Sequence, residues 1–243
     1  MFDNAHLSPW KEAILYVIRQ SFPAGTGHYD EIMEKQFMNI NQHKNLPLKD
    51  FIEVLSENFT RYQRHVDGEY QIIPREKQKK FLHHIITGDE CFHFSEVGSG
   101  KTKVIMPLLC QIFLSNNKEA HHYLARGGEQ KHTLVILVPE HLLPDARTQV
   151  FRHCLNLNFR QDYRVYDDIL SLLHDNVTFE SIQNKPQKKI FVTSFNQFKK
   201  ALTYEKICKK IRPHCEHILV VADEVDDFLG KCDKCFACTL SSS

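Results

Sequence analysis

The sequence predicts an α/β fold in which helices cover both faces of a parallel sheet, with a small helical region before it. Three observations predict this fold. Strand-like apolar runs alternate with helical segments from Pro74 onward, a glycine turn at 98–102 joins an apolar run to a helix, and an acidic cluster follows the last apolar run. The expected parts are a helical region at 1–73, the α/β domain at 74–230 and an irregular Cys/Ser tail at 231–243.

The first 73 residues are expected to be helical and to carry no chemistry. Helices are predicted from Ser8 to about Phe22 and from Asp30 to Ile40, and a third follows Pro47. The third has its apolar residues on one face: Leu48, Phe51, Ile52, Leu55 and Phe59. Such a stripe indicates a packing surface.

A short helix is expected at 76–86, ending near Gly88, after Pro74 interrupts the helical pattern. It contains Gln78, and two interpretations of this residue remain open. It could hydrogen-bond the edge of an adenine ring, or it could be a polar residue on an exposed helix face.

The next segment has the pattern of a phosphate-binding loop. An apolar run at 91–94, expected to be the first strand of the sheet, leads into Gly98-Ser99-Gly100-Lys101-Thr102, and a helix is expected over 103–114. In G-x-x-x-x-G-K-[ST] the backbone N–H groups surround the phosphates, the lysine contacts the β- and γ-phosphates, and the hydroxyl binds Mg²⁺. The first glycine of this pattern is replaced by Ser95.

The rest of the chain is expected to alternate between strands and helices. A polar loop is predicted at 115–130, strands at 133–138, 189–194 and 218–222, and helices from after Asp145 to about Cys154, at 167–174 and at 195–211. The helix at 195–211 is rich in lysine: Lys199, Lys200, Lys206, Lys209 and Lys210.

The last predicted strand is wholly apolar and ends in Asp223-Glu224-Val225-Asp226-Asp227. In an open α/β sheet, ligands bind at the carboxyl ends of the strands. We therefore expect Asp223 and Glu224 to lie beside the phosphate loop, with Asp223 and Thr102 holding Mg²⁺.

The composition is that of an ordinary globular protein. The 243 residues are 42% hydrophobic and 25% charged with a net charge of +1, so no overall basic field favours nucleic acid. No segment reaches the ~20 apolar residues of a membrane span, and the amino terminus lacks a signal region. We expect an intracellular protein, in the cytoplasm or nucleus, with its eight cysteines mostly as free thiols.

Together these motifs resemble the first RecA-like lobe of superfamily-two helicase-type ATPases. The resemblance covers about residues 71–229. Within this range it rests on the glycine loop, the acidic cluster and the segments 138–142 and 192–195. The chain is similar to one branch in particular, an uncharacterised domain family of very large eukaryotic proteins, some described as ubiquitin thioesterase-like. Its loop departs from that family's Met-Gly-Glu-Gly-Lys-Thr at two positions.

The resemblance implies Mg²⁺-dependent ATP binding and hydrolysis. Lys101 would neutralise phosphate charge, and Glu224 would polarise the attacking water. Helicase-type hydrolysis also needs a second lobe that supplies an arginine, and the residues after Asp227 are too few to form it. We expect a second RecA-like lobe or another chain to complete the site.

Other functions remain open. The chain could be a non-catalytic scaffold that binds a protein partner, or part of a ubiquitin-specific cysteine peptidase with Cys91 as a candidate nucleophile. Buried strand packing is the simpler role for Cys91. The lysine-rich helix could contact nucleic acid or form a solvated face. The motif Cys232-x-x-Cys235-x-x-Cys238 has zinc-like spacing but lacks a fourth paired ligand, so loose thiols are the favoured interpretation.

Overall fold

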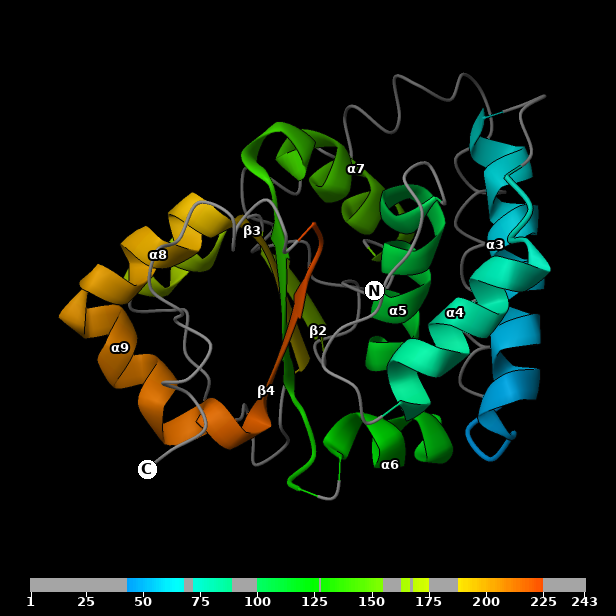
Figure 1. The fold of residues 1–243 in the computed structure, drawn as a ribbon, viewed down its shortest axis with the longest axis horizontal. Coiled ribbons are helices and arrows are strands. Elements are labelled where there is room, and N and C mark those ends of the chain that lie inside the picture. The colour runs from blue at the N-terminus through cyan, green and yellow to red at the C-terminus, as the bar shows by residue number, and fades with distance from the viewer. Residues whose placement is uncertain are drawn as a thin grey trace, which may run out of the picture. The chain divides into compact units, whose positions relative to one another are not determined.

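The predicted parallel sheet is present in the computed structural model (Figure 1). The model describes residues 43–67, 72–88, 100–126, 128–154, 163–166, 168–174 and 188–224. Within these residues the sheet has four parallel strands in the order β2-β3-β1-β4. Their bounds are β1 Thr133–Val138, β2 Tyr163–Tyr166, β3 Lys188–Ser194 and β4 Ile218–Ala222. Three of the four strands were predicted from the sequence.

The register of the strands brings their carboxyl ends to one edge. Val138 lies opposite Ser194, and Leu137 lies opposite Ala222. Because the strands are parallel, whatever follows β4 emerges beside the ends of β1 and β3. The sequence analysis predicts the ligand-binding site at this edge.

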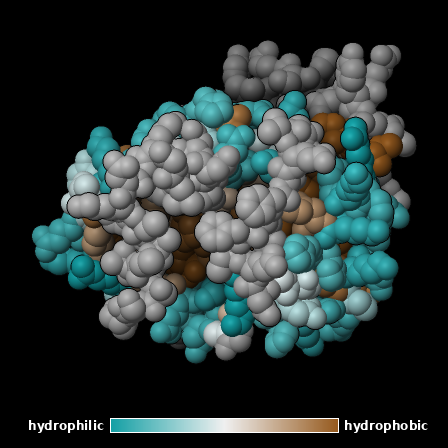
Figure 2. Space-filling model, in the orientation of Figure 1, coloured by the Kyte–Doolittle hydropathy of each residue, from teal (hydrophilic) through white to brown (hydrophobic). Residues whose placement is uncertain are grey.

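The central strands are buried on both faces, whereas β4 is not. Every residue of β1 and β3 is buried, as expected for strands with helices on either side. All residues of β4 are only partly covered, and Val220 remains 43% exposed. Figure 2 shows hydrophilic residues over most of the described surface, and apolar atoms near the middle, where β4 lies in Figure 1.

Helices α8 and α9 and the short 3₁₀ helix η4 pack against one face of the sheet (Figure 1). They span Phe195–Thr203, Glu205–Ile211 and Ile169–Leu173. The shared core consists of Val135, Leu137, Ile169, Leu172, Phe191, Ala201 and Ile207. A further 3₁₀ segment, η5 at Arg212–His217, connects α9 to β4.

The opposite face is covered by the helices that follow the phosphate turn and β1. Here α5 (Met106–Leu114) packs on α7 (Leu143–Cys154), and the flanking elements are η1 (Lys101–Ile105), α6 (Lys118–Ala125) and η2 (Glu140–Leu142). Helix α5 has buried residues all around and only Gln111 is half-exposed. It is therefore an internal helix of this domain.

Helix α3 (Leu48–Asp67) lies outside α5 and also contacts α4 (Glu76–Thr87). The predicted stripe on α3 is confirmed, because its five apolar residues are at most 2% exposed. All described residues belong to one compact unit, 40–243, so α3 packs with the α/β domain. The two helices predicted before residue 41 lie outside the described residues.

The loop predicted at 115–130 is wrong, because α6 forms there. Asn117 caps this helix by accepting a hydrogen bond from the Ala120 N–H (2.9 Å), and its own amide donates to the carbonyls of His43 and Leu46. A fully buried asparagine thus starts the helix and ties it to the residues before α3. The polar composition of residues 115–130 favoured a loop, so the capping role of Asn117 was not predicted.

The single helix predicted at 195–211 is also wrong. It breaks at Tyr204, whose backbone is extended, into α8 and α9. In one continuous helix, Ala201 and Ile207 would point about 120° apart around the axis. The break allows both to enter the same core. Strand β2 was not predicted, and the helix predicted at 167–174 is the 3₁₀ helix η4.

No helix in the described part of the chain is long and apolar enough to cross a membrane.

Candidate functional site

The residue just before the helix, Gly100, has a backbone conformation that favours glycine; it is the described end of the turn at 98–102, called here the phosphate turn. Gly100 has φ +82°, a left-handed conformation that side chains disfavour. A Cβ at Gly100 would also lie 2.5 Å from Nε2 of Gln78, so the end of that side chain would have to move. The positive φ is therefore the main reason for a glycine at this position.

A helix begins directly after the turn with one wide, π-type turn. Lys101 O accepts from the Met106 N–H, and Gly100 O accepts from Val104 (2.8 Å) and Ile105 (3.3 Å). The helix continues without interruption through α5. Since the first N–H groups of a helix have no intrahelical acceptor, they and the helix dipole make this end attractive to anions.

Lys101 and Asp223 meet at the carboxyl edge of the sheet. Nζ of Lys101 lies 3.4 Å from Oδ1 of Asp223, and the two side chains are 25% and 10% exposed. Asp223 is held there by its own N–H, which donates to Leu137 O (2.9 Å) and extends the β1–β4 pairing by one residue. Lys101 of the glycine motif and Asp223 of the acidic motif therefore lie side by side, as the sequence predicts.

Glu224 follows with an unusual backbone. Its φ is +53°, one of two positive values among the described non-glycine residues, and its side chain is partly buried. A left-handed conformation costs a non-glycine residue roughly 1–2 kcal/mol. Strained residues of this kind are concentrated at functional sites.

Gln78 lies against the phosphate turn. Its Oε1 accepts the Arg75 N–H (2.7 Å), and its Nε2 faces the position of the missing Gly100 side chain. Gln78 is half-buried here. A contact to the adenine edge stays a prediction.

Several predicted residues lie outside the described part of the chain: Gly98, Ser99, Cys91, Cys232, Cys235 and Cys238. Thr102 is described and partly buried, one residue beyond Lys101 on the same helix. Among the described residues, no group of three or more His, Cys, Asp or Glu side chains is arranged to hold a metal ion. A magnesium site made of Thr102, Asp223 and phosphate oxygens would not form such a group.

Sequence reasoning missed a polar network at the end of β3. Arg147 donates to the Val192 carbonyl (3.4 Å) and to Oε1 of Gln197 (3.2 Å), while Thr193 donates to Asp168 (3.2 Å). The signal available was Ser194-x-x-Gln197, which forms a capping box at the start of α8. The network fixes the end of β3 at the same edge of the sheet as Asp223.

The described residues fit an ATP phosphate chain and Mg²⁺. They provide a glycine turn that a Cβ would crowd, a helix N-terminus, a lysine ammonium, a threonine hydroxyl and a carboxylate that is mostly buried. These are the groups that bind phosphates and Mg²⁺ in proteins. The fold and the site together define a P-loop nucleotide-binding domain of the RecA-like class.

The chain belongs to the DEAD/DEAH box helicase family, whose family model matches residues 75–240. It therefore contains a helicase-type, P-loop ATP-binding domain. The match concerns the helicase-type domain and carries no indication of ubiquitin chemistry. Comparison with curated proteins and with solved structures gives no match. Helix α3 precedes the matched region.

Proposed function

We propose that this protein binds ATP with Mg²⁺ and hydrolyses it as one lobe of a helicase-type motor. The observation that carries the proposal is the 3.4 Å approach of Lys101 to Asp223, two residues that are far apart in the sequence. The positive charge of Lys101 suits phosphate oxygens, and the negative charge of Asp223 suits Mg²⁺. A lysine at a helix N-terminus is electrostatically unfavourable without an anion beside it, and Asp223 supplies that anion here.

Each residue then has a defined role. Lys101 binds the β- and γ-phosphate oxygens, and the backbone from Gly98 to Thr102, including Ser99 and Gly100, surrounds them. Thr102 and Asp223 hold Mg²⁺, which neutralises phosphate charge when bound. Glu224 orients the attacking water and accepts its proton, and Gln78 keeps the turn in place and contacts the base.

Hydrolysis in this proposal needs a second lobe, from this protein or another chain, because an arginine donated to the γ-phosphate raises rates by ~10³-fold or more. Nucleic acid is the proposed polymer, and the exposed Lys200 on α8 is available to contact its backbone. Lys210 on α9 is not available in this way, because it donates to the carbonyls of Leu172 and His174. An ATP-dependent protein with free thiols at Cys110, Cys154, Cys208 and Cys215 fits an intracellular location.

Titration with a fluorescent ATP analogue, with and without Mg²⁺, tests the proposal. Lys101→Ala is expected to weaken binding about 10- to 100-fold, since a charge-assisted hydrogen bond contributes about 1.5–3 kcal/mol. Lys103→Ala is the matched control, because this exposed lysine lies on the same helix. Glu224→Gln should leave affinity unchanged and abolish hydrolysis.

Equal and negligible affinity in the wild type and in Lys101→Ala would contradict the proposal and favour a scaffold that keeps the fold. Affinity that does not depend on Mg²⁺ would remove the roles given to Thr102 and Asp223.

A further inference from the structure

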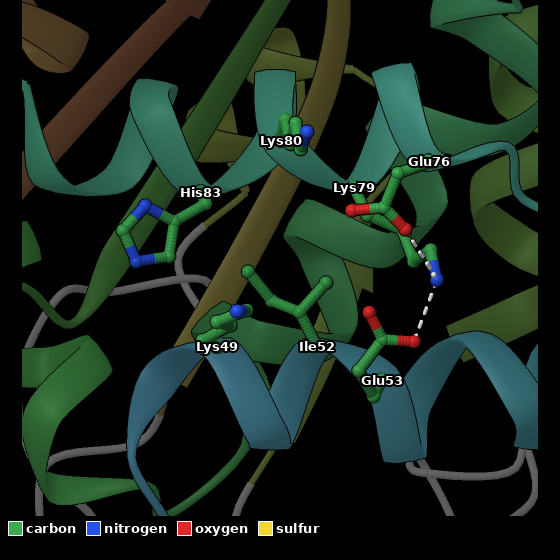
Figure 3. Close-up of a pocket in the computed structure, with 7 residues that line it drawn as sticks. All are labelled: Lys49, Ile52, Glu53, Glu76, Lys79, Lys80 and His83. Atoms are coloured by element: carbon green, nitrogen blue, oxygen red, sulfur yellow. Dashed lines mark hydrogen bonds and ion pairs between the residues drawn. The ribbon is translucent and has the colours of Figure 1, made fainter.

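The described residues line a hollow between α3 and α4 that takes no part in the proposed ATP site (Figure 3). Its volume is about 300 Å³. The lining residues are Lys49, Ile52 and Glu53 from α3, and Glu76, Lys79, Lys80 and His83 from α4. One wall is therefore formed by a helix outside the region matched by the family model.

One end of the hollow is closed by ion pairs. Nζ of Lys79 lies 2.6 Å from Glu53 and 3.0 Å from Glu76, and its side chain is only 18% exposed. The hydrogen bond that Lys79 donates to Glu53 raises the pKa of Lys79, and the hydrogen bond that Lys79 donates to Glu76 lowers the pKa of Glu76. Both lining carboxylates are thus already engaged with one lysine.

The other end carries cations without such partners. Figure 3 shows His83 and Lys49 at the end opposite the ion pairs, with Ile52 pointing from α3 into the space between them. Lys49 and Lys80 are exposed, whereas Ile52 is 2% exposed and forms an apolar floor. Three lysines against two glutamates give the lining a net charge of +1 with His83 neutral; Lys49 lies beside His83, and Lys80 lies on α4 between His83 and Glu76 (Figure 3).

We propose that the hollow between α3 and α4 binds a small organic anion, a carboxylate or a phosphate monoester with a short apolar part. Lys49, Lys80 and His83 would hold the anionic group, and Ile52 would contact the apolar part. A volume of about 300 Å³ is at the lower end of the range of ligand pockets, which suits a few carbons better than a second nucleotide.

Binding there should also affect the phosphate turn, and this part rests on the proposed function. Helix α4 carries the lining residues Lys79, Lys80 and His83 and also Gln78, which touches Gly100. A ligand that bridges α3 and α4 changes the position or rigidity of α4. The expected effect on ATP affinity is a few-fold, at the low end of typical couplings between sites.

Methyl NMR of the isoleucine-labelled chain, without nucleotide, tests the site directly. Glycerol 3-phosphate and glutarate are the two anionic probes, and glycerol is the uncharged one. A saturable shift of the Ile52 methyl signal is expected with at least one anion, with a Kd on the order of 1 mM. Whichever anion binds more tightly identifies the class of ligand.

The double variant Lys49→Ala/Lys80→Ala should weaken the response at least 10-fold, while Lys77→Ala should leave it unchanged, because Lys77 is exposed on α4 but does not line the hollow. The proposal is overturned if neither anion moves Ile52, if glycerol moves it equally, or if the double variant responds like the wild type. Since the assay contains no nucleotide, a failure of ATP binding would leave its result intact.

Discussion

The helix that runs from Lys101 to Leu114 has a lysine at each end, and the two lysines differ in exposure and in their partners. Lys101 lies at the amino end, 25% exposed and paired with Asp223. Lys188, from the start of β3, lies at the carboxyl end and donates to the carbonyls of Phe113 (3.0 Å), Leu114 (3.4 Å) and Ser115 (2.5 Å). It is buried, and its Nζ also lies 2.9 Å from Nε2 of His121.

The helix dipole explains why Lys188 is held by backbone carbonyls and Lys101 by a carboxylate. A cation at the carboxyl end of a helix is stabilised by the carbonyl groups there, so Lys188 is satisfied without any ligand. A cation at the amino end is opposed by the same dipole, so Lys101 needs an anion. The comparison teaches that the two ends of one helix hold a lysine in different ways, by a carboxylate at the amino end and by backbone carbonyls at the carboxyl end.

Removing Lys188 should have the largest effect on stability. Lys188→Ala leaves carbonyls at the end of α5 without their donor and opens a cavity, and we expect a loss of about 3 kcal/mol in the free energy of unfolding. Urea denaturation measures it, with Lys200→Ala as the exposed control. A loss below about 1 kcal/mol would mean that Lys188 does not hold the helix end.

Gly100→Ala should disturb the other end by about 2 kcal/mol. The substitution places a side chain at φ +82° and pushes a Cβ against Gln78. Adding Gln78→Ala should relieve the clash and recover part of the stability, while the cost of the positive φ remains. If the double variant is no more stable than the single one, then Gln78 is not what confines the turn.

The pH dependence of stability should report the burial of Lys188. Burial lowers the pKa of Lys188 to about 7 from its usual 10.5. Because the unfolded chain then binds more protons between these values, stability should rise with pH, by about 1 kcal/mol from pH 6 to pH 8. Lys188→Met should flatten this rise in urea midpoints, and an unchanged slope would contradict the assignment.

A second, acidic window should come from His121. Burial, and then the nearby charge of Lys188, lower the pKa of His121 to about 4. The folded state therefore resists its protonation, and stability should fall further as the pH drops from 6.5 toward 4.

The smallest effect should come from an exposed lysine with a single partner. Lys209 lies 2.8 Å from Glu205 one turn earlier on α9, and both side chains are at least 75% exposed. Lys209→Ala should change the free energy of unfolding by less than about 0.5 kcal/mol. A larger loss in the same urea assay would show that exposure is a poor guide to the role of a lysine in this domain.

The sequence predicted the parts of the fold in which local pattern and tertiary structure agree. The strands that form β1, β3 and β4 are continuous apolar runs, and the meeting of Lys101 with Asp223 follows once the strands are parallel. Strand β2 is short and carries Arg164 between two tyrosines, so nothing in its pattern marked it. Asn117 and Lys188 could not be assigned either, because their partners lie about 70 residues away along the chain.

The wide first turn at Lys101–Ile105 has a consequence for how this helix can vary. A π-turn holds one residue more than an α-turn, and it rotates everything before it by roughly 100° about the helix axis. The start of the helix is therefore rotated relative to Leu108 and Ile112, which are fully buried. Deleting one residue from the turn would rotate the Lys101 ammonium away from Asp223. The buried residues of α5 would keep their positions in the core.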